Sequence, residues 1–126
     1  MLTLTPVVFV EAIEPCLHFW HDLGFETTME VPGDRGLGFA ALKSGDVEVM
    51  YQSFASLESD LPALVEQQWG PANFFIRVDD LDSLKPTLES GDVVVPERET
   101  FYGSREIVVR AACGTIVNFA EFAENA

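Results

Sequence analysis

The chain has 126 residues, which is long enough for one hydrophobic core and too short for two independent domains. Hydrophobic residues make up 48% of the chain, which argues against disorder. No apolar run approaches the roughly 20 residues that a membrane-spanning helix needs. With 21 acidic residues against 7 basic ones the net charge is −14, so we expect neither nucleic acid nor an anionic membrane as a partner. Such a surface favours solubility and attracts cationic ligands.

Residues 4–11 form an apolar, β-branched run that predicts a strand buried on both faces. A helix is predicted to open at Pro15, because proline suits the first helical turn, and to end at Gly24 in the left-handed conformation. One apolar face of this helix consists of Cys16, Phe19, Trp20 and Leu23. Three strands are predicted next, over residues 25–31, 36–42 and 46–54, with breaks at 32–36 and at Ser44-Gly45-Asp46.

Residues 55–71 are more polar, and we predict a connector there with a short helix near 61–67. A strand from about residue 72 follows, and Asp80 can cap the next helix. The apolar stripe of that helix is Leu81, Leu84 and Leu88, with Pro86 expected to weaken or kink it. The last strands are predicted at 91–97, 105–111 and 115–122, with Ala112-Cys113-Gly114 turning the final hairpin.

The two halves of the chain resemble each other. A shift of 68 residues brings Ile13 onto Leu81 and Trp20 onto Leu88. We therefore predict an α+β fold of two tandem βαβββ modules whose curved mixed sheets surround a shared cleft. The whole chain would be one domain, with module one at 1–54, the connector at 55–71 and module two at 72–126.

The cysteines, Cys16 and Cys113, are far apart and form no Cys-x-x-Cys motif, so we predict two free thiols in a reducing cytoplasm. The first five residues carry no basic region and no cleavage pattern, so no secretory signal is expected. Both observations favour a cytoplasmic location.

Two motifs add to the order of elements: Phe-Trp-His-Asp-Leu-Gly-Phe-Glu at 19–26, and Phe-Tyr-Gly-Ser-Arg-Glu at 101–106 followed by Gly-Thr-Ile-Val at 114–117. Together they resemble the vicinal oxygen chelate superfamily, which includes glyoxalases, extradiol dioxygenases, fosfomycin-modifying enzymes and bleomycin-resistance proteins. The resemblance covers nearly the whole chain. It is specific for the fold and not for the activity, because one fold supports many chemistries.

In metal-using members of that superfamily, the first strand of each module generally supplies His or Gln and the last strand supplies Glu. The resemblance places these positions at Thr5, Glu48, Asn73 and Asn118. One carboxylate with neutral oxygens holds a transition metal weakly, and a register slip to Glu121 would still bring no histidine. We therefore predict no metal site and no cofactor.

The only histidines are His18 and His21, which could hold a metal together with Asp22. Exposed side chains on a solvated helix are the more common arrangement, and we predict that here.

Without a metal, the resemblance implies the bleomycin-resistance-like branch, whose members bind a ligand without transforming it. We expect an aromatic or cationic organic ligand, and the resemblance implies a role in antibiotic resistance. No catalytic residue is assigned. The predicted ligand-binding residues are the cavity walls Phe9, Phe39, Met50, Phe54, Phe75 and Tyr102, the rim residue Trp69, and the polar contacts Thr5, Glu48, Asn73, Glu106 and Asn118.

Glu48 either faces the cavity and favours cationic ligands, or faces outward or pairs with Arg77 or Arg105. Arg105 and Glu106 could also form an internal ion pair at the pocket mouth. A homodimer is expected, because four-stranded half-sheets leave unpaired edges.

Three other functions stay open from the sequence. The first is a metal-dependent glyoxalase-like lyase or dioxygenase. The second is metal-free catalysis with Glu48 or Glu106 as general base, although no second catalytic group is apparent. The third is an interaction module whose cavity is filled by its own side chains.

Overall fold

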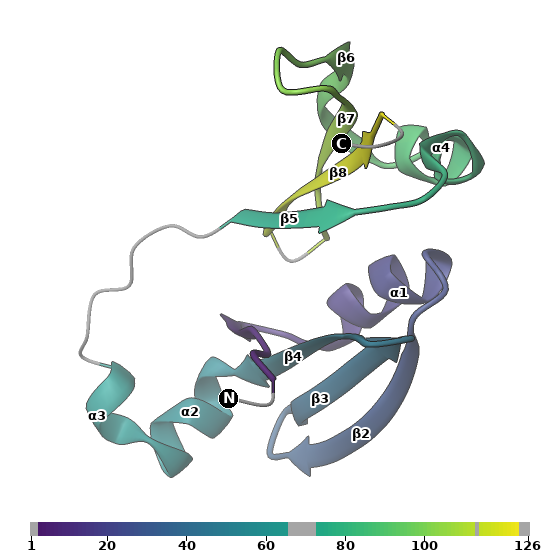
Figure 1. The fold of residues 1–126 in the computed structure, drawn as a ribbon. Helices are drawn as coiled ribbons and strands as arrows, with labels where there is room; N and C mark the ends of the chain where they lie inside the picture. The colour runs from purple at the N-terminus through teal and green to yellow at the C-terminus, as the bar shows by residue number, and fades with distance from the viewer. Residues whose placement is uncertain (1–2, 66–72, 113, 124–126) are drawn as a thin grey trace. The chain divides into compact units, whose positions relative to one another are not determined.

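The computed structural model describes residues 3–65, 73–112 and 114–123, so the predictions for Trp69 and Cys113 lie outside the described residues. The chain divides into two compact units, residues 1–69 and 70–126. Each unit contains a four-stranded mixed sheet and a helix between its first two strands (Figure 1). The predicted α+β fold of two βαβββ modules is therefore confirmed.

In the first unit the strands lie in the order β1-β4-β3-β2, with β1 parallel to β4 and the other neighbours antiparallel. Two short helices follow the sheet. The elements are β1 (Val7–Val10), α1 (Glu14–Asp22), β2 (Glu26–Gly33), β3 (Gly36–Ser44), β4 (Val47–Ser53), α2 (Phe54–Asp60) and α3 (Pro62–Val65).

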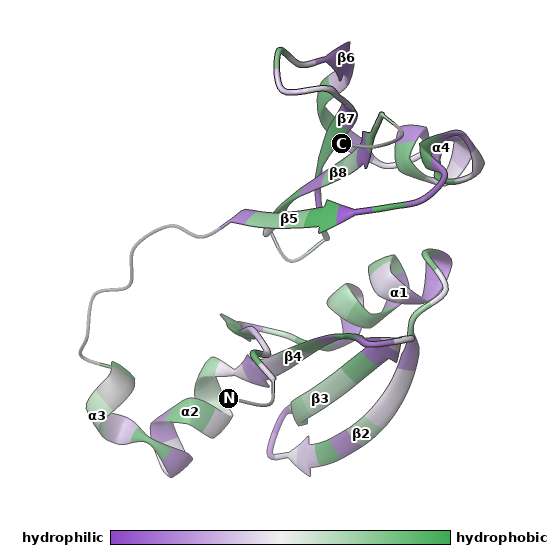
Figure 2. Ribbon diagram, viewed as in Figure 1, coloured by the Kyte–Doolittle hydropathy of each residue, from purple (hydrophilic) through white to green (hydrophobic). Residues whose placement is uncertain are grey.

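The second unit has the same arrangement, with strand order β5-β8-β7-β6 and β5 parallel to β8. Its first strand is hydrophobic between the polar end residues Asn73 and Arg77 (Figure 2). The elements are β5 (Asn73–Arg77), α4 (Leu81–Glu89), β6 (Asp92–Glu99), β7 (Ser104–Arg110) and β8 (Ile116–Phe122).

The repeat extends to the strand register. Val7 pairs with Met50 in the first unit and Phe75 pairs with Asn118 in the second, and each residue of one pair lies 68 positions from its counterpart. Ile13 and Leu81, also 68 apart, are both fully buried.

Helix α1 packs its apolar face on the first sheet. Trp20 is only 1% exposed, and its Nε1–H donates a hydrogen bond to the Tyr51 hydroxyl at 2.6 Å, which confirms the predicted place of Trp20 in the core. Gly24, with φ of 92°, follows the helix in the left-handed conformation, as predicted.

Strand β1 is shorter than the sequence predicts, and fewer of its residues are buried. Only Val10 of this strand is buried, and Val7 is 42% exposed. The prediction of a strand buried on both faces is wrong because α1 covers only one face of the sheet.

The segment after β4 contains more helix than predicted, since α2 follows the strand at once. Ser53 caps it by accepting a hydrogen bond from the Ser56 N–H at 3.0 Å. Phe54, predicted to lie on a strand, is therefore the first residue of a helix, and its strand assignment is wrong, while its role as a cavity wall stays a prediction. Ser53 could have indicated the start of this helix, because serine is a common N-cap residue.

Helix α4 begins after Asp80, whose carboxylate accepts a hydrogen bond from the Ser83 N–H at 3.2 Å, so the predicted cap is confirmed. The helix continues through Pro86 to Glu89. Among the described residues, no helix has both the length and the apolar character needed to cross a membrane.

Candidate functional site

The first sheet has one face covered by α1 and one open face. Because side chains alternate along a strand, Val49 and Tyr51 point to the helix and Met50 points to the open face. Two rows of paired residues cross all four strands on that open face. They are Met29-Ala41-Met50-Val7 and Val31-Phe39-Gln52-Phe9.

This open face exposes apolar side chains. Val7 is 42%, Met29 54% and Val31 46% exposed, and Phe9, Phe39 and Met50 are half-buried beside them. An exposed apolar surface is a common feature of faces that contact a ligand or another protein surface.

A carboxylate lies at one end of the patch. The Thr5 hydroxyl donates a hydrogen bond to Glu48 Oε1 at 3.2 Å, and both residues are half-buried. Neither predicted arginine partner is found at Glu48 among the described contacts. Arg105 binds acidic residues of the second unit, and Arg77 lies over a phenyl ring.

The second sheet also has an open face, opposite α4. Val117, Phe119 and Ile107 are buried toward the helix, and the alternating residues Glu106 and Asn118 lie on the other side. Here the Glu106 side chain is fully buried. Its carboxylate accepts hydrogen bonds from the Tyr102 hydroxyl at 2.5 Å, the Ser104 hydroxyl at 2.7 Å, Asn118 Nδ2 at 3.0 Å and Arg98 at 3.2 Å.

These bonds set the protonation state of Glu106. Burial raises its pKa, but the four donors outweigh burial and lower the pKa to about 2. Glu106 is thus a carboxylate at neutral pH with its acceptor positions occupied. The pKa of the Tyr102 phenol is raised, chiefly by its hydrogen bond to Glu106.

Three aromatic rings, which we name the aromatic row, lie over the same open face: Phe75, Phe122 and Tyr102. The ring centres of Phe75 and Phe122 are 6.2 Å apart, and those of Tyr102 and Phe122 are 6.1 Å apart. The Arg77 guanidinium lies 4.3 Å from the centre of the Phe122 ring.

The register corrects one predicted equivalence. Asn118 pairs with Phe75 and corresponds to Met50, so the counterpart of Glu48 is Ile116, which pairs with Asn73. The prediction that treated Glu48 and Asn118 as symmetric was two residues out of register. The Oδ1 atom of Asn118 is buried and has no hydrogen-bond partner among the described residues.

Within each unit by itself, these positions offer few ligands for a transition metal. In the first unit Thr5 and Glu48 offer one hydroxyl and one carboxylate, and in the second unit Asn73 and Ile116 offer one amide and no donor at all. Glu121 is no substitute, because it accepts a hydrogen bond from the Leu81 N–H at 2.7 Å at the start of α4. Within residues 3–65, 73–112 and 114–123 no three His, Cys, Asp or Glu side chains are grouped as metal ligands.

The two histidines lie on the exposed side of α1. His18 lies 3.6 Å from Asp22, and the His21 ring hydrogen-bonds the Thr27 hydroxyl at 2.7 Å. They have separate partners, so they form no common site.

A cavity of about 420 Å³ lies elsewhere in the first unit, between the β2–β3 turn and α2. It is lined by side chains that include Arg35, Ser53 and Ser59, and by none of the predicted ligand-binding residues.

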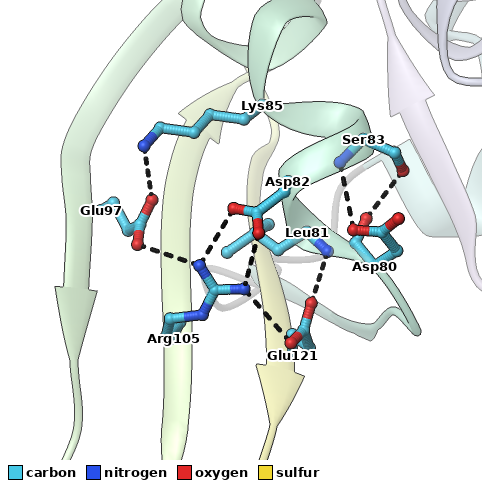
Figure 3. Close-up of polar contacts among 8 residues, drawn as sticks. All are labelled: Asp80, Leu81, Asp82, Ser83, Lys85, Glu97, Arg105 and Glu121. Carbon is cyan, nitrogen blue, oxygen red and sulfur yellow. Dashed lines mark hydrogen bonds and ion pairs between the residues drawn. The ribbon is translucent and has the colours of Figure 1, made fainter.

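Arg105 and Glu106 do not form the predicted ion pair, because neighbouring residues of a strand point to opposite faces. Arg105 lies on the helix side, where it binds Asp82 of α4 at 3.0 Å, Glu97 of β6 at 3.3 Å and Glu121 of β8 at 3.2 Å (Figure 3). Lys85 also binds Glu97, at 2.7 Å. This network joins α4 to three strands of the sheet.

We expect Arg105→Met to lower the midpoint of thermal unfolding by roughly 5 °C. The substitution leaves three carboxylates close together in a protein of net charge −14. Added salt should reduce the difference from wild type, because it screens their repulsion. Calorimetry can measure both effects. Arg110→Met is the matched control, since Arg110 binds one exposed acid, Asp92, at 3.0 Å, and an equal loss in both variants would contradict a special role for the network.

The predicted ligand-binding residues thus fall into three groups. On the open face of the first sheet lie Thr5, Phe9, Phe39, Glu48 and Met50, and on that of the second unit lie Asn73, Phe75, Tyr102, Glu106 and Asn118. Phe54 is on α2, and Trp69 lies outside the described residues. Sequence reasoning missed Val7, Met29, Val31, Arg98 and Phe122, although the period of two from Phe9 and Asn118 could have indicated Val7 and Phe122.

No protein-family model and no curated protein sequence matches the chain. Solved structures are similar to it. A glyoxalase/bleomycin resistance protein/dioxygenase from Nocardioides is 18% identical with a TM-score of 0.75, over 100% of this chain and 87% of that one. The lactoylglutathione lyase of Agrobacterium tumefaciens is 17% identical with a TM-score of 0.74, over 96% and 94% of the two chains.

A third structure is the bleomycin-binding protein of bleomycin-producing Streptomyces verticillus, solved with copper(II)-bleomycin. It is 23% identical with a TM-score of 0.63, over 98% of both chains. Similarity at these identities concerns the fold. The chain therefore has the vicinal oxygen chelate fold, which it shares with glyoxalases, bleomycin-resistance proteins and dioxygenases.

Proposed function

We propose that this protein binds and sequesters a small organic ligand, aromatic or cationic, without using a metal ion. The observation that carries the proposal is the position of Glu48, a half-buried carboxylate at the end of an exposed apolar sheet face. Such a surface combines apolar area for binding with one charged group for orientation.

Charge favours a cationic ligand. Among the described hydrogen bonds and ion pairs, the carboxylate of Glu48 has only the neutral Thr5 hydroxyl as a partner, and Lys43, which pairs with Glu48 across β3 and β4, forms no ion pair with it, so an ammonium group would find an acceptor there. The net charge of −14 adds long-range attraction. The bleomycin-binding protein of Streptomyces verticillus gives a precedent for ligand binding on this fold.

Binding without turnover is supported by the state of Glu106. A general base needs a pKa near the working pH and a free lone pair, and Glu106 has a pKa of about 2 and four donors around it. The donor set described above likewise supports metal independence.

Glu48→Gln is expected to weaken binding of proflavine, a planar aromatic amine that is cationic at neutral pH, by about tenfold. The substitution keeps the shape and hydrogen-bonding capacity of the side chain and removes the charge, which is the strong part of a charge-assisted hydrogen bond. Isothermal titration calorimetry measures the affinity. EDTA in the buffer should leave the affinity of the wild type unchanged.

Glu58→Gln is the matched control, because it removes the same charge from an exposed position on α2. Equal affinity for proflavine in wild type and Glu48→Gln would contradict the anchoring role of Glu48. A loss of binding in EDTA would contradict metal independence.

A further inference from the structure

The cavity of about 420 Å³ in the first unit lies between the β2–β3 turn and α2, and no residue in the two rows on the open sheet face lines it. We propose that this cavity binds a small zwitterion whose carboxylate and ammonium groups are close together, as they are in a free α-amino acid. The site does not include Glu48, so the proposal is independent of the proposed function. The walls include two acids, one arginine and three serines: Glu11, Asp34, Arg35, Ser53, Ser56 and Ser59.

The second unit has a charged bridge where the first unit has none. The strand register makes Gly38 the counterpart of Arg105, because each precedes the residue that pairs with equivalent positions of β4 and β8, 52 and 120. The guanidinium of Arg105 binds three carboxylates. No such bridge can form at Gly38, and α2 comes close to it instead, since a Cβ on Gly38 would lie 3.2 Å from Ser56 Cβ. The first unit therefore has no charged side chain of its own at this position, and the cavity beside it stays open to a ligand.

Three serine hydroxyls supply hydrogen-bond donors to the cavity. Ser53, Ser56 and Ser59 recur every three residues from the N-cap of α2, so they lie on one side of the helix. The Ser53 oxygen accepts a hydrogen bond from the Ser56 N–H at 3.0 Å, and the Ser56 oxygen accepts one from Gln52 Nε2 at 3.3 Å. A hydroxyl whose oxygen accepts a hydrogen bond can still donate its proton. Neither proton has an acceptor among the described hydrogen bonds, so both can be donated to a carboxylate.

Charged side chains in the walls favour a ligand that carries both charges. Arg35, in the two-residue turn between β2 and β3, supplies a guanidinium, which can bind both oxygens of a carboxylate. Glu11 and Asp34 supply carboxylates that attract an ammonium group. A simple anion would be repelled by the two acids, and a simple cation would leave the guanidinium and the hydroxyl protons without an acceptor. A zwitterion satisfies all of these groups.

The turn that carries Arg35 is held in place before a ligand binds. Glu14 of α1 accepts a hydrogen bond from the Leu37 N–H at 2.8 Å, directly after the turn. Gly36 has a φ of 93°, and a Cβ at this position would come within 2.6 Å of Glu14 Oε2, so glycine allows the carboxylate to reach the turn. Less conformational freedom is then lost on binding.

A titration of the full chain with L-alanine at pH 7 tests the site, with calorimetry for the affinity and amide chemical shifts for the location. Propionate and ethylamine are the matched probes, because propionate is L-alanine without the ammonium group and ethylamine is L-alanine without the carboxylate. Each should bind about tenfold more weakly than L-alanine, since each leaves wall groups of one sign unpaired. The largest shifts are expected over residues 33–37 and 53–59.

Arg35→Gln should weaken the binding of L-alanine about tenfold, because the amide keeps a hydrogen-bond donor and lacks the charge. Arg35 is exposed in a turn, so its replacement should not affect folding. Arg110→Gln is the matched control, since it removes the same charge from an exposed position on β7 of the other unit and should leave the affinity unchanged. Ser56→Ala removes one hydroxyl donor and should weaken binding less than Arg35→Gln.

Three results would overturn the proposal: no saturable binding of L-alanine, equal affinity for L-alanine and propionate, or equal affinity of wild type and Arg35→Gln for L-alanine. The second result would mean that the cavity recognises a carboxylate only. Glu48→Gln should leave the affinity for L-alanine unchanged, and Arg35→Gln should leave the affinity for proflavine unchanged. Failure of this site and failure of the proposed function are therefore distinguishable.

Discussion

Replacing Glu106 by leucine is expected to lower the free energy of unfolding by about 3 kcal/mol, the largest loss from any single substitution considered for this chain. The carboxylate is fully buried and accepts hydrogen bonds from four side chains. Arg98 and Tyr102 are partly exposed and can turn to water, but Ser104 is only 3% exposed and Asn118 is half-buried. The loss of stability therefore comes mainly from Ser104 and Asn118, whose donor groups would be left without an acceptor and cannot reach water.

Urea denaturation of the two proteins at pH 7 measures this loss. Glu99→Leu is the matched control, because Glu99 is exposed on the neighbouring strand and its replacement should change stability by no more than about 0.5 kcal/mol. Glu106→Gln should lie between wild type and Glu106→Leu, since its amide keeps one acceptor oxygen. Equal stability of Glu106→Leu and Glu99→Leu would show that the four contacts contribute nothing.

Much of the fold could be predicted from local signals. The spacing of Cys16, Phe19 and Trp20 marked one helix, and Asp80 marked the start of the other. Gly24 and Gly45 have positive φ values of 92° and 58°, and both had been identified as turn residues. The repeat itself was visible because buried positions such as Ile13 and Leu81 recur at a constant shift.

Predictions about which residues are equivalent in the two units were wrong where they depend on strand register. The sequence predicts Asn118 as the counterpart of Glu48, but a shift of two residues keeps the same face of the strand, so alternation alone cannot detect it. The pairing of β5 with β8 decides the matter, and it is non-local. For the arginine that pairs with Glu106, in contrast, alternation along the strand is informative. Arg105 could have been excluded by alternation, and Arg98 is the arginine opposite Glu106 on β6.

The candidate site was only partly accessible from the sequence for the same reason. Phe9 and Phe39 were recognised as strand aromatics, and the structure brings them onto one open face beside Gln52. The proximity of Phe75, Phe122 and Tyr102 could not be predicted, because it depends on the non-local pairing of β8 with β5 and β7.

The stability of the second unit should fall as the pH is lowered from about 4.5 toward 2, by up to about 3 kcal/mol from Glu106 alone. The folded protein lowers the pKa of Glu106 from 4.5 to about 2, so the unfolded chain takes up the proton first. The stabilisation is therefore complete above pH 4.5 and is lost as the pH falls through the folded-state value. Asp82, Glu97 and Glu121 of the same unit also have lowered pKa values and contribute in the same direction. Their contribution is common to wild type and Glu106→Leu, so the difference in stability between these two proteins isolates the effect of Glu106.

Urea denaturation at intervals between pH 7 and pH 2.5 measures that difference, which should shrink below pH 4.5. A difference that stays constant over this range would mean that Glu106 is not held as a carboxylate by its four donors.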